Sequence, residues 1–290
     1  MKKIAFVYDF DGTLAEGNIQ EHSLLGALGY DPEAFWDQVE ELAKQQDADE
    51  ILVYLQQMIE AARAAGTPLT RAMLAAHGSG IKLFPGVQEW FQRINQYARK
   101  DCGLEPEHFI ISSGNLEMIE GTSIAHQFTR IFACKFLFDD NGHACWPGVG
   151  VNYTTKTQYL FRINKGIHNC HDSKRLNKWL DQDQRPVPFE RMIFFGDGDT
   201  DIPAMKLVKT QGGYSIAVFD NKLWNEATCQ EKIHKLISED RVSYVAPGNY
   251  ESASLLDVTV KGLLKRMGRM TVPGTRYLLP FRLLPSLAML

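Results

Sequence analysis

The chain has few cysteines, and they are scattered. Its 290 residues include five, at Cys102, Cys134, Cys145, Cys170 and Cys229. An odd number without paired spacing argues against a disulfide framework and against a zinc site. We therefore expect reduced thiols, as in the cytoplasm.

Long hydrophobic runs are also missing. No stretch reaches the roughly 18 uncharged apolar residues that a membrane-spanning helix needs. Near the start, Met1-Lys2-Lys3 leads after only five apolar or aromatic residues into Asp9, which is too short a run for a secretory signal. We expect a cytoplasmic protein that does not associate with membranes.

A basic surplus is absent as well. Lys and Arg number 31 against 35 Asp and Glu, giving a net charge of −4, whereas nucleic-acid binders usually carry excess positive charge. The rest of the composition, 44% hydrophobic and 23% charged, is that of an ordinary globular protein. We expect no nucleic-acid partner, so any anionic substrate must be held by a few local residues.

Short apolar runs recur along the chain, and most end in polar or glycine residues. They are 4–8, 109–111, 192–195, 215–218 and 242–245. Segments of helical period lie between them, at 87–97, 174–180, 223–237 and 252–264. Strands alternating with helices predict an α/β fold with a mainly parallel sheet flanked by helices. Ligands of such sheets bind at the carboxyl ends of the strands.

The strand signal disappears between residues 15 and 83. Helical patterns cover 31–45, 48–65 and 70–77 there, and Phe84-Pro85-Gly86 marks the return to strands and crossover helices. We therefore predict a discontinuous α/β core, 1–14 and 84–267, with an all-helical insert at 15–83. The remaining 268–290 form a tail that is rich in Leu and Pro from Met270 onward. Packing against the body is the simplest expectation for it, with an intermolecular contact and partial disorder as the alternatives.

A second excursion covers Phe132 to Trp146. Its apolar positions nearly alternate on both sides of Asp139-Asp140-Asn141-Gly142. Because Asn-Gly between strand-like runs favours a tight turn, this segment predicts a β-hairpin.

Two carboxylates follow the first predicted strand, in Asp9-Phe10-Asp11-Gly12-Thr13. Two like charges so close raise each other's pKa unless a cation or hydrogen bonds offset them. The pair therefore indicates a divalent metal, or an acid role for one of the two. Gly12 would let the backbone approach an anion, and Thr13 offers a hydroxyl. A plain acidic turn is the structural alternative.

A second acidic group, Gly196-Asp197-Gly198-Asp199-Thr200-Asp201, also follows an apolar strand. Hard oxygen ligands in a short loop suit Mg²⁺. An EF-hand is excluded, because no glutamate follows at the closing position of such a loop. Capping of the next helix accounts for one of these residues but not for all three carboxylates.

Two weaker signals lie between these acidic groups. Ser112-Ser113-Gly114-Asn115 follows the run at 109–111, where a hydroxyl and free backbone N–H groups can bind phosphate. Lys156 lies at the start of a predicted helix. Alone, Ser112 and Ser113 are ordinary turn residues, and Lys156 is an ordinary surface lysine.

Taken in order, these motifs resemble the four motifs of the haloacid-dehalogenase superfamily. They are Asp9-x-Asp11-x-Thr13, then Ser112, then Lys156, then Gly196-Asp197 with Asp201. The resemblance covers about residues 4–220 and implies a Rossmann-like core. The helical insert and the hairpin are more particularly similar to the phosphoserine-phosphatase branch, in which the insert is a cap.

This resemblance implies a mechanism and a set of residue roles. Asp9 would attack phosphorus to give an aspartyl-phosphate, and Asp11 would act as general acid and then base. Mg²⁺ would be bound by Asp9, the main-chain carbonyl of Asp11 and Asp197, with Asp201 orienting the ligands or Lys156. Ser112 and Lys156 would hold the phosphoryl oxygens, with Thr13, Ser113 and Gly114 nearby. Ser113 replaces Ser112 if the strand is one residue longer.

The expected substrate is a small phosphorylated metabolite. An acid at position 11 implies a phosphatase, or a phosphomutase or phosphotransferase, because dehalogenases and ATP-driven pumps resemble the motif but lack that acid. The phosphoserine branch has a Glu nine residues after the nucleophile, whereas this chain has Asn18, which argues against phosphoserine. A slowly hydrolysed, Asp-phosphorylated signalling module is a remote alternative. Oligomeric state is left open.

Overall fold

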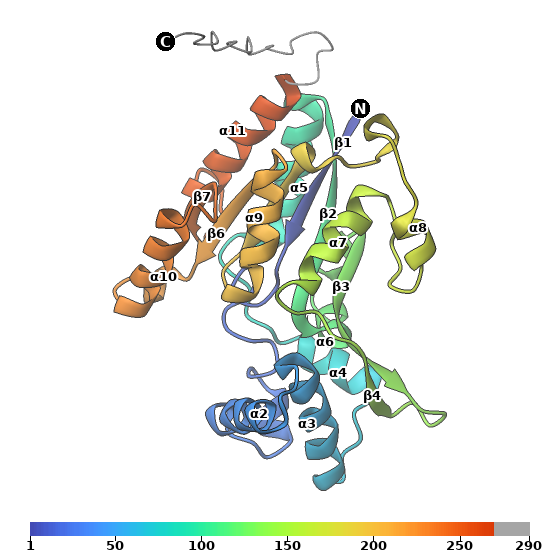
Figure 1. The fold of residues 1–290 in the computed structure, drawn as a ribbon. Helices are drawn as coiled ribbons and strands as arrows, with labels where there is room; N and C mark the ends of the chain where they lie inside the picture. The colour runs from blue at the N-terminus through green and yellow to red at the C-terminus, as the bar shows by residue number, and fades with distance from the viewer. Residues whose placement is uncertain (270–290) are drawn as a thin grey trace, which may run out of the picture.

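The computed structural model describes residues 1–269, which contain a seven-stranded sheet flanked by helices (Figure 1). The strands are β1 (Lys2–Tyr8), β2 (Leu104–Asn115), β3 (Arg130–Phe138), β4 (Ala144–Val149), β5 (Met192–Gly196), β6 (Tyr214–Phe219) and β7 (Tyr244–Pro247). Their order is β4-β3-β2-β1-β5-β6-β7, and every pairing is parallel except β3 with β4. The predicted α/β fold is confirmed.

Strand β1 occupies the middle of the sheet. Its last five residues are buried, as expected for a parallel strand covered on both faces. At its carboxyl end, Tyr8 pairs with Ile110 of β2 on one side and with Phe195 of β5 on the other. The ends of three strands therefore lie side by side, and the motif residues follow or belong to these ends.

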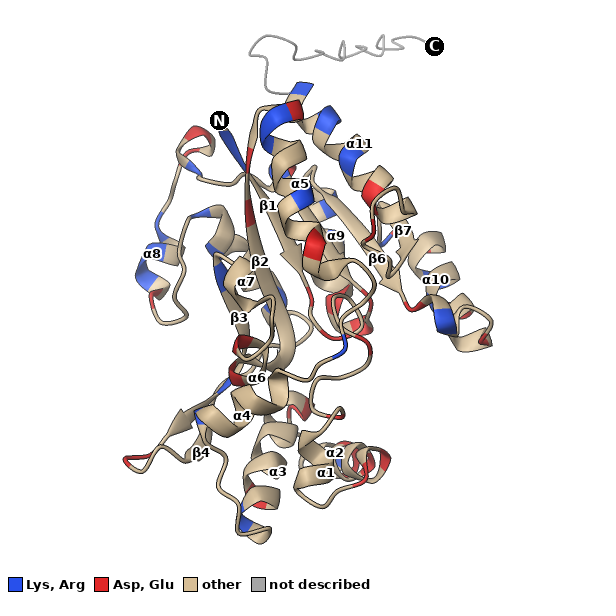
Figure 2. Ribbon diagram, turned by 180° about the vertical axis from the view of Figure 1, so that it is seen from behind, with Lys and Arg blue, Asp and Glu red and all other residues tan. Residues whose placement is uncertain are grey.

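Helices cover both faces of the sheet. In the views of Figures 1 and 2, α5 (Val87–Cys102) and α11 (Leu255–Arg269) lie on one face, and α7 (Thr155–Asn164) and α9 (Ile202–Thr210) lie on the other. The remaining elements outside the insert are α6 (Leu116–Glu120), α8 (Ser173–Asn177), α10 (Ala227–Ser238), and the 3₁₀ turns η1 (Ala125–Gln127), η2 (Gln182–Gln184), η3 (Phe189–Arg191), η4 (Asp199–Asp201) and η5 (Asn221–Leu223). No helix within residues 1–269 is long and apolar enough to cross a membrane.

Four helices lie between β1 and α5, beyond the carboxyl ends of the central strands (Figure 1). They are α1 (Leu24–Ala27), α2 (Pro32–Gln46), α3 (Glu50–Ala64) and α4 (Arg71–Gly78). Helix α2 begins where expected, because the Asp31 carboxylate accepts a hydrogen bond from the Ala34 N–H at 3.2 Å and Pro32 occupies the first turn. The helical character of this segment agrees with the prediction, whereas its exact domain boundaries stay predictions.

The chain enters and leaves this insert at neighbouring points. The Glu16 N–H donates to the Lys82 carbonyl at 3.0 Å, and the Phe84 N–H donates to the Leu14 carbonyl at 2.9 Å. The two connections therefore run side by side, which fixes the position of the insert above the strand ends.

The predicted hairpin is formed by β3 and β4, and Gly142 adopts a positive φ of 77° in its turn. The Asp139 carboxylate accepts hydrogen bonds from the Asn141 and His143 N–H groups, both at 2.9 Å. The hairpin also contacts the insert, because the Ala144 N–H donates to the Leu69 carbonyl at 2.8 Å. This contact was not predicted, since it joins segments far apart in the sequence.

Several element boundaries differ from those predicted. Strand β2 begins at Leu104 rather than at residue 109, because it runs in register along the whole of β1. Helix α8 ends at Asn177 rather than at 180, where the Lys165 ammonium binds the carbonyls of Leu176 and Lys178. Helix α11 continues to Arg269, past the predicted end of the core. From position 270 onward the predicted tail lies outside the described residues.

Candidate active site

Asp9 lies directly after β1. Its N–H donates to the Phe195 carbonyl at 2.8 Å, which extends the pairing with β5 by one residue. Its side chain is therefore held at the carboxyl edge of the sheet, where only 5% of the residue is exposed.

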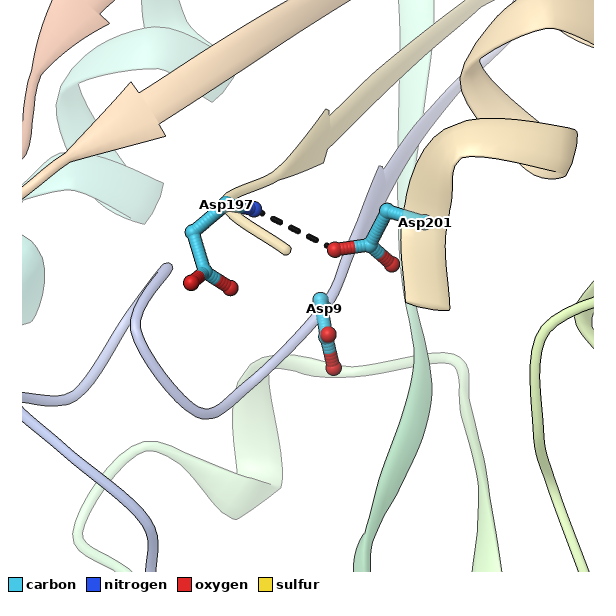
Figure 3. A group of neighbouring side chains, drawn as sticks. All are labelled: Asp9, Asp197 and Asp201. Atoms are coloured by element: carbon cyan, nitrogen blue, oxygen red, sulfur yellow. Dashed lines mark hydrogen bonds between the residues drawn. The ribbon is translucent and has the colours of Figure 1, made fainter. Parts of the chain in front are cut away.

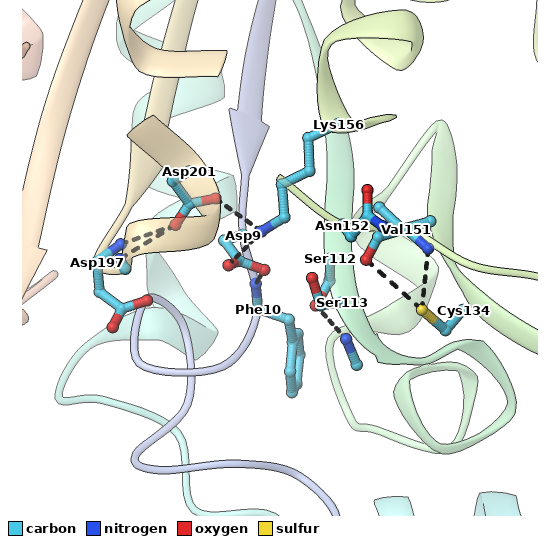
Figure 4. A network of polar contacts seen from close by, with 12 residues as sticks. Asp9, Phe10, Ser112, Ser113, Cys134, Val151, Asn152, Lys156, Asp197 and Asp201 are labelled. Carbon is cyan, nitrogen blue, oxygen red and sulfur yellow. Dashed lines mark hydrogen bonds and ion pairs between the residues drawn. The ribbon is translucent and has the colours of Figure 1, made fainter. Parts of the chain in front are cut away.

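Lys156, at the start of α7, is fully buried beside Asp9. Its ammonium donates to an oxygen of Asp9 and to an oxygen of Asp201, both at 2.7 Å (Figure 4). Burial alone would lower the pKa of Lys156, but the two carboxylates outweigh burial and raise it above its usual range. The lysine therefore stays charged between two acids that are far apart in the sequence.

Asp197 and Asp201 approach Asp9 from the loop after β5 (Figure 3). Asp201 Oδ2 accepts hydrogen bonds from the N–H groups of Asp197 and Gly198, both at 3.2 Å, so the loop closes on itself. One oxygen from each of Asp9, Asp197 and Asp201 lies within 4.8 Å of the others. Three converging carboxylates are the hard donor set that Mg²⁺ prefers.

The electrostatics of these acids also fit a bound cation. Burial first, and then the charge of Asp9, raise the pKa of Asp197 to about 6 although Lys232 acts against the shift. The same two causes raise the pKa of Asp201 well above its usual range. Carboxylates crowded in this way repel one another, and a divalent cation among them would remove the repulsion. The residues present therefore fit a magnesium ion.

Gly12 allows the loop after β1 to approach this group. Its φ is 65°, in the left-handed region that favours glycine, and a Cβ placed there would lie 2.5 Å from Cγ of Asp197. No other residue fits this position without moving the Asp197 carboxylate.

Asp11 lies next to the three carboxylates but is not one of them. One of its oxygens accepts a hydrogen bond from the Ile19 N–H at 2.8 Å. Burial, and then the charge of Asp9, raise the pKa of Asp11 well above its usual range. A raised pKa favours the protonated form of this carboxyl group, which can donate its proton to a leaving group.

Ser112 and Asp11 meet at Gly114. A Cβ on Gly114 would lie 2.7 Å from Asp11 Oδ2 and 3.2 Å from Ser112 Oγ. Ser112 is fully buried, and its Oγ accepts a hydrogen bond from the Gly114 N–H at 3.0 Å. The glycine therefore lets the hydroxyl and the carboxyl group share one small space.

Ser113 and Thr13 occupy different surroundings. Ser113 lines the cavity described below. Its hydroxyl is buried without a hydrogen-bond partner within residues 1–269, and its carbonyl accepts from the Tyr54 hydroxyl at 2.7 Å. The Thr13 hydroxyl is buried, also without a partner there, and its carbonyl accepts from the Tyr250 hydroxyl at 2.8 Å. Because β2 continues to Asn115, both serines belong to the strand, and the preference for Ser112 over Ser113 stays a prediction.

A cavity of about 610 Å³ opens over these residues. Asp9, Asp11 and Ser112 form part of its base, and Trp36 and Tyr54 of the insert line another side. The structure thus brings most of the predicted residues to one cavity. Lys156 and Asp201 do not line it but are buried behind its base, where Lys156 binds Asp9 and Asp201 accepts from the Asp197 N–H.

A further side of the cavity comes from η5 and α10, which the motifs did not indicate. Leu223, Cys229 and Lys232 line it, and the Lys232 ammonium lies 3.6 Å from an oxygen of Asp197. The sequence shows only a helical period in this segment, so no local signal could have marked these residues as part of the site.

Comparison with known proteins gives a family and a set of similar folds. The family model described as haloacid dehalogenase-like hydrolase matches residues 6–206. An uncharacterized protein of Borreliella burgdorferi is 27% identical over 276 residues, which cover 87% of this chain and 93% of that protein.

Three solved structures share the fold at low sequence identity. A HAD family hydrolase from Salmonella enterica serovar Typhi is 20% identical, with a TM-score of 0.51 over 79% of this chain and 65% of its own. A substrate-bound phosphoserine phosphatase is 15% identical, with a TM-score of 0.51 over 82% of this chain and 99% of its own. A cytosolic 5'-nucleotidase IIIB bound to cytidine is 14% identical, with a TM-score of 0.51 over 92% of this chain and 87% of its own.

Proposed function

The chain belongs to the haloacid dehalogenase-like hydrolase family, and we propose that it is a magnesium-dependent phosphatase acting on a small phosphomonoester. The family match confirms the resemblance drawn from the four motifs. The observation that carries the proposal is the Asp11 carboxyl group, which has a raised pKa and lies in one cavity with Asp9 and Ser112. Structures of similar fold include a phosphoserine phosphatase and a nucleotidase, which supports a phosphomonoester as the substrate class.

In the proposed reaction, Asp9 attacks phosphorus and the bond from phosphorus to the leaving oxygen breaks. Asp11 gives its proton to that oxygen, so an alcohol departs and an aspartyl-phosphate remains. Asp11, now a carboxylate, takes a proton from water as the water attacks phosphorus. This second step releases inorganic phosphate and restores Asp9.

Other side chains offset the charge of the phosphoryl group. The ammonium of Lys156 lies against Asp9. When Asp9 forms its bond to phosphorus and loses its negative charge, this ammonium would stabilise the negative phosphoryl oxygens instead. Ser112 would donate its hydroxyl proton, with Ser113 as the alternative, and Thr13 and Gly114 stay predicted phosphate ligands. Asp9, Asp197 and the Asp11 carbonyl would hold Mg²⁺, with Asp201 beside them. Magnesium would supply positive charge to the phosphoryl oxygens.

The test is release of phosphate from p-nitrophenyl phosphate in the presence of Mg²⁺. We expect turnover by the wild type and a fall in kcat of at least about a thousandfold in Asp9→Asn, because the nucleophile is lost. Asp37→Asn, at an exposed position of α2, is the control and should keep normal turnover. The proposal fails if the wild type releases no phosphate, or if Asp9→Asn behaves like the wild type.

A phosphomutase or phosphotransferase is the second candidate. It is favoured by the size of the cavity, which leaves room beside a phosphoryl group for an acceptor hydroxyl. Analysis of the products from sugar phosphates separates the two activities, because transfer gives a new phosphate ester and hydrolysis gives inorganic phosphate.

A further inference from the structure

The cavity is much larger than the phosphate site at its base. Its volume of about 610 Å³ falls within the range of sites that enclose a whole small-molecule ligand. The space away from Asp9 is therefore available to the leaving group of the ester, and its lining determines which leaving groups fit.

Much of this lining is aromatic or aliphatic. On the insert side, Trp36 and Tyr54 pack edge to face, with ring centroids 5.6 Å apart. The indole N–H of Trp36 donates to Glu21 at 2.7 Å, so its polar atom is already bonded. On the opposite side, Phe219 and Leu223 belong to β6 and η5. In Figures 1 and 2, α10 and the insert helix α2 lie on the same side of the molecule, in agreement with a cavity lined by both.

The charged groups of the lining are mostly acidic. Besides the residues at the base, the carboxylates of four residues line the cavity, namely Glu50, Asp199, Asp220 and Glu226. Within residues 1–269, Glu50, Asp199 and Glu226 form no salt bridge. None of these three carboxylates is therefore in ion-pair contact with a cation among the described residues.

Among the described residues that line the cavity, only one carries a positive charge. Lys232 is the single Lys or Arg among the described lining residues, and its ammonium is 3.6 Å from Asp197. Lys222 is close in sequence to Asp220, but its ammonium binds Glu16 at 2.7 Å. An anionic group on the substrate would thus meet carboxylates. The one cation among the described lining residues, Lys232, is already paired with Asp197.

From this lining we infer that the substrate is the phosphomonoester of a cationic alcohol, such as an amino alcohol. The inference rests on the proposed function and adds the chemical class of the leaving group. A positive charge is attracted by the four carboxylates and by the aromatic rings of Trp36 and Tyr54 that line the cavity. A negative charge is repelled by the same carboxylates, so the cavity selects against acidic leaving groups.

The test compares three esters of similar length that differ in terminal charge. They are 4-aminobutyl, 4-hydroxybutyl and 3-carboxypropyl phosphate, with p-nitrophenyl phosphate as the general substrate. We expect kcat/KM to be highest for the amine and at least about tenfold lower for the carboxylate. This ratio should fall as ionic strength rises, because salt screens the carboxylates.

Variants of the lining identify the source of the selection. Glu50→Gln and Glu226→Gln should each reduce the amine-to-carboxylate ratio by about threefold, because each removes one negative charge. Glu33→Gln is the matched control for Glu50, since both acids lie in the first turn of an insert helix but Glu33 does not line the cavity. It should leave the ratio unchanged.

The outcomes separate this inference from the proposed function. Equal turnover of the three esters, or preference for the carboxylate, overturns the inference. If p-nitrophenyl phosphate is still hydrolysed in that case, the proposed phosphatase function is unaffected. A ratio that does not change in Glu50→Gln and Glu226→Gln also overturns it. If no ester is hydrolysed by the wild type, the proposed function fails and the inference falls with it.

Discussion

Gly12 is the residue at which the backbone and the acidic cluster come closest. Gly12→Ala would place a Cβ 2.5 Å from Cγ of Asp197 and must displace that carboxylate. Because small displacements of reacting groups are costly, we expect kcat/KM for p-nitrophenyl phosphate to fall about a hundredfold. Steady-state kinetics of the purified variant measures this.

Gly29→Ala is the control for backbone strain. Gly29 also has a positive φ, 82°, but a Cβ added to it would have no atom within 4 Å. Both variants should lose about 1 kcal/mol of unfolding free energy from the unfavourable φ, and only Gly12→Ala should lose activity. Similar kinetics for the two variants would show that contact with Asp197 is unimportant.

Lys156 is the one ammonium among residues 1–269 that binds both Asp9 and Asp201, and it is fully buried. Lys156→Met would leave two buried carboxylates without their cation. We expect the free energy of unfolding at pH 7 to fall by about 3 kcal/mol or more. Urea titration followed by circular dichroism measures the change.

Lys232→Met provides the comparison for Lys156→Met. Lys232 is only partly buried and has a single, longer ion pair of 3.6 Å with Asp197. Its loss should cost less than about 1 kcal/mol. Equal losses in the two variants would contradict a special role of Lys156 in neutralising the site.

The residues at the base of the site could be predicted from the sequence, because each belongs to a short motif next to an apolar run. Asp9, Asp11 and Asp197 follow strands whose ends meet at one sheet edge. The residues on the far side of the cavity could not be predicted in this way. Glu226 and Lys232 line the cavity only because α10 packs beside β6. The residues next to them in the sequence give no indication of this packing.

Among the structural elements, β1, β2 and α5 are joined by a buried polar chain. The Trp90 indole N–H donates to the Tyr8 hydroxyl at 2.9 Å, and that hydroxyl contacts His108 Nδ1 at 3.2 Å. His108 Nε2 lies 2.8 Å from Asn95 Oδ1, so Nε2 carries the proton that binds Asn95. Burial, and then the charge of Arg99, lower the pKa of His108 to about 3.

This shift predicts a pH dependence of stability. Between pH 6.5 and 3 the unfolded chain protonates His108 while the folded chain does not, so the unfolded state binds more protons and stability falls with decreasing pH. At pH 5 the histidine should have removed roughly 2 kcal/mol of the unfolding free energy present at pH 7. Urea titrations at both pH values measure the loss.

His108→Phe isolates the contribution of the histidine. The variant keeps an aromatic ring against Phe6, whose ring centroid lies 4.9 Å from that of His108, but it cannot be protonated. It should be less stable than the wild type at pH 7, because the bonds to Tyr8 and Asn95 are lost, and it should lose less stability on acidification. The same loss in both proteins would assign the pH dependence to other groups.

The strands and most helices could be predicted, because apolar runs and helical periods are local properties of the chain. The length of β2 could not, since Leu104 and Glu105 join the strand only through pairing with Lys2 and Lys3 of β1. The contact of the hairpin with the insert was also missed. It depends on a backbone bond between Ala144 and Leu69, and backbone groups have no sequence signature.

At the scale of the whole molecule, the insert and the sheet share one hydrophobic core. Phe35 and Tyr54 of the insert belong to the same buried cluster as Phe109 and Phe195 of the sheet. Polar contacts cross between the two parts as well. The Tyr54 hydroxyl donates to the Ser113 carbonyl at 2.7 Å, and the Asn152 amide donates to the Asp49 carboxylate.

This continuity predicts that the insert and the sheet unfold together. We expect a single urea transition, with the same midpoint by far-ultraviolet circular dichroism and by tryptophan fluorescence, because Trp36 reports on the insert and Trp90 on the sheet layer. Tyr54→Phe removes one contact between them and should lower the unfolding free energy by about 1 kcal/mol without splitting the transition. Two separate transitions in the wild type would show instead that the insert is an independent folding unit.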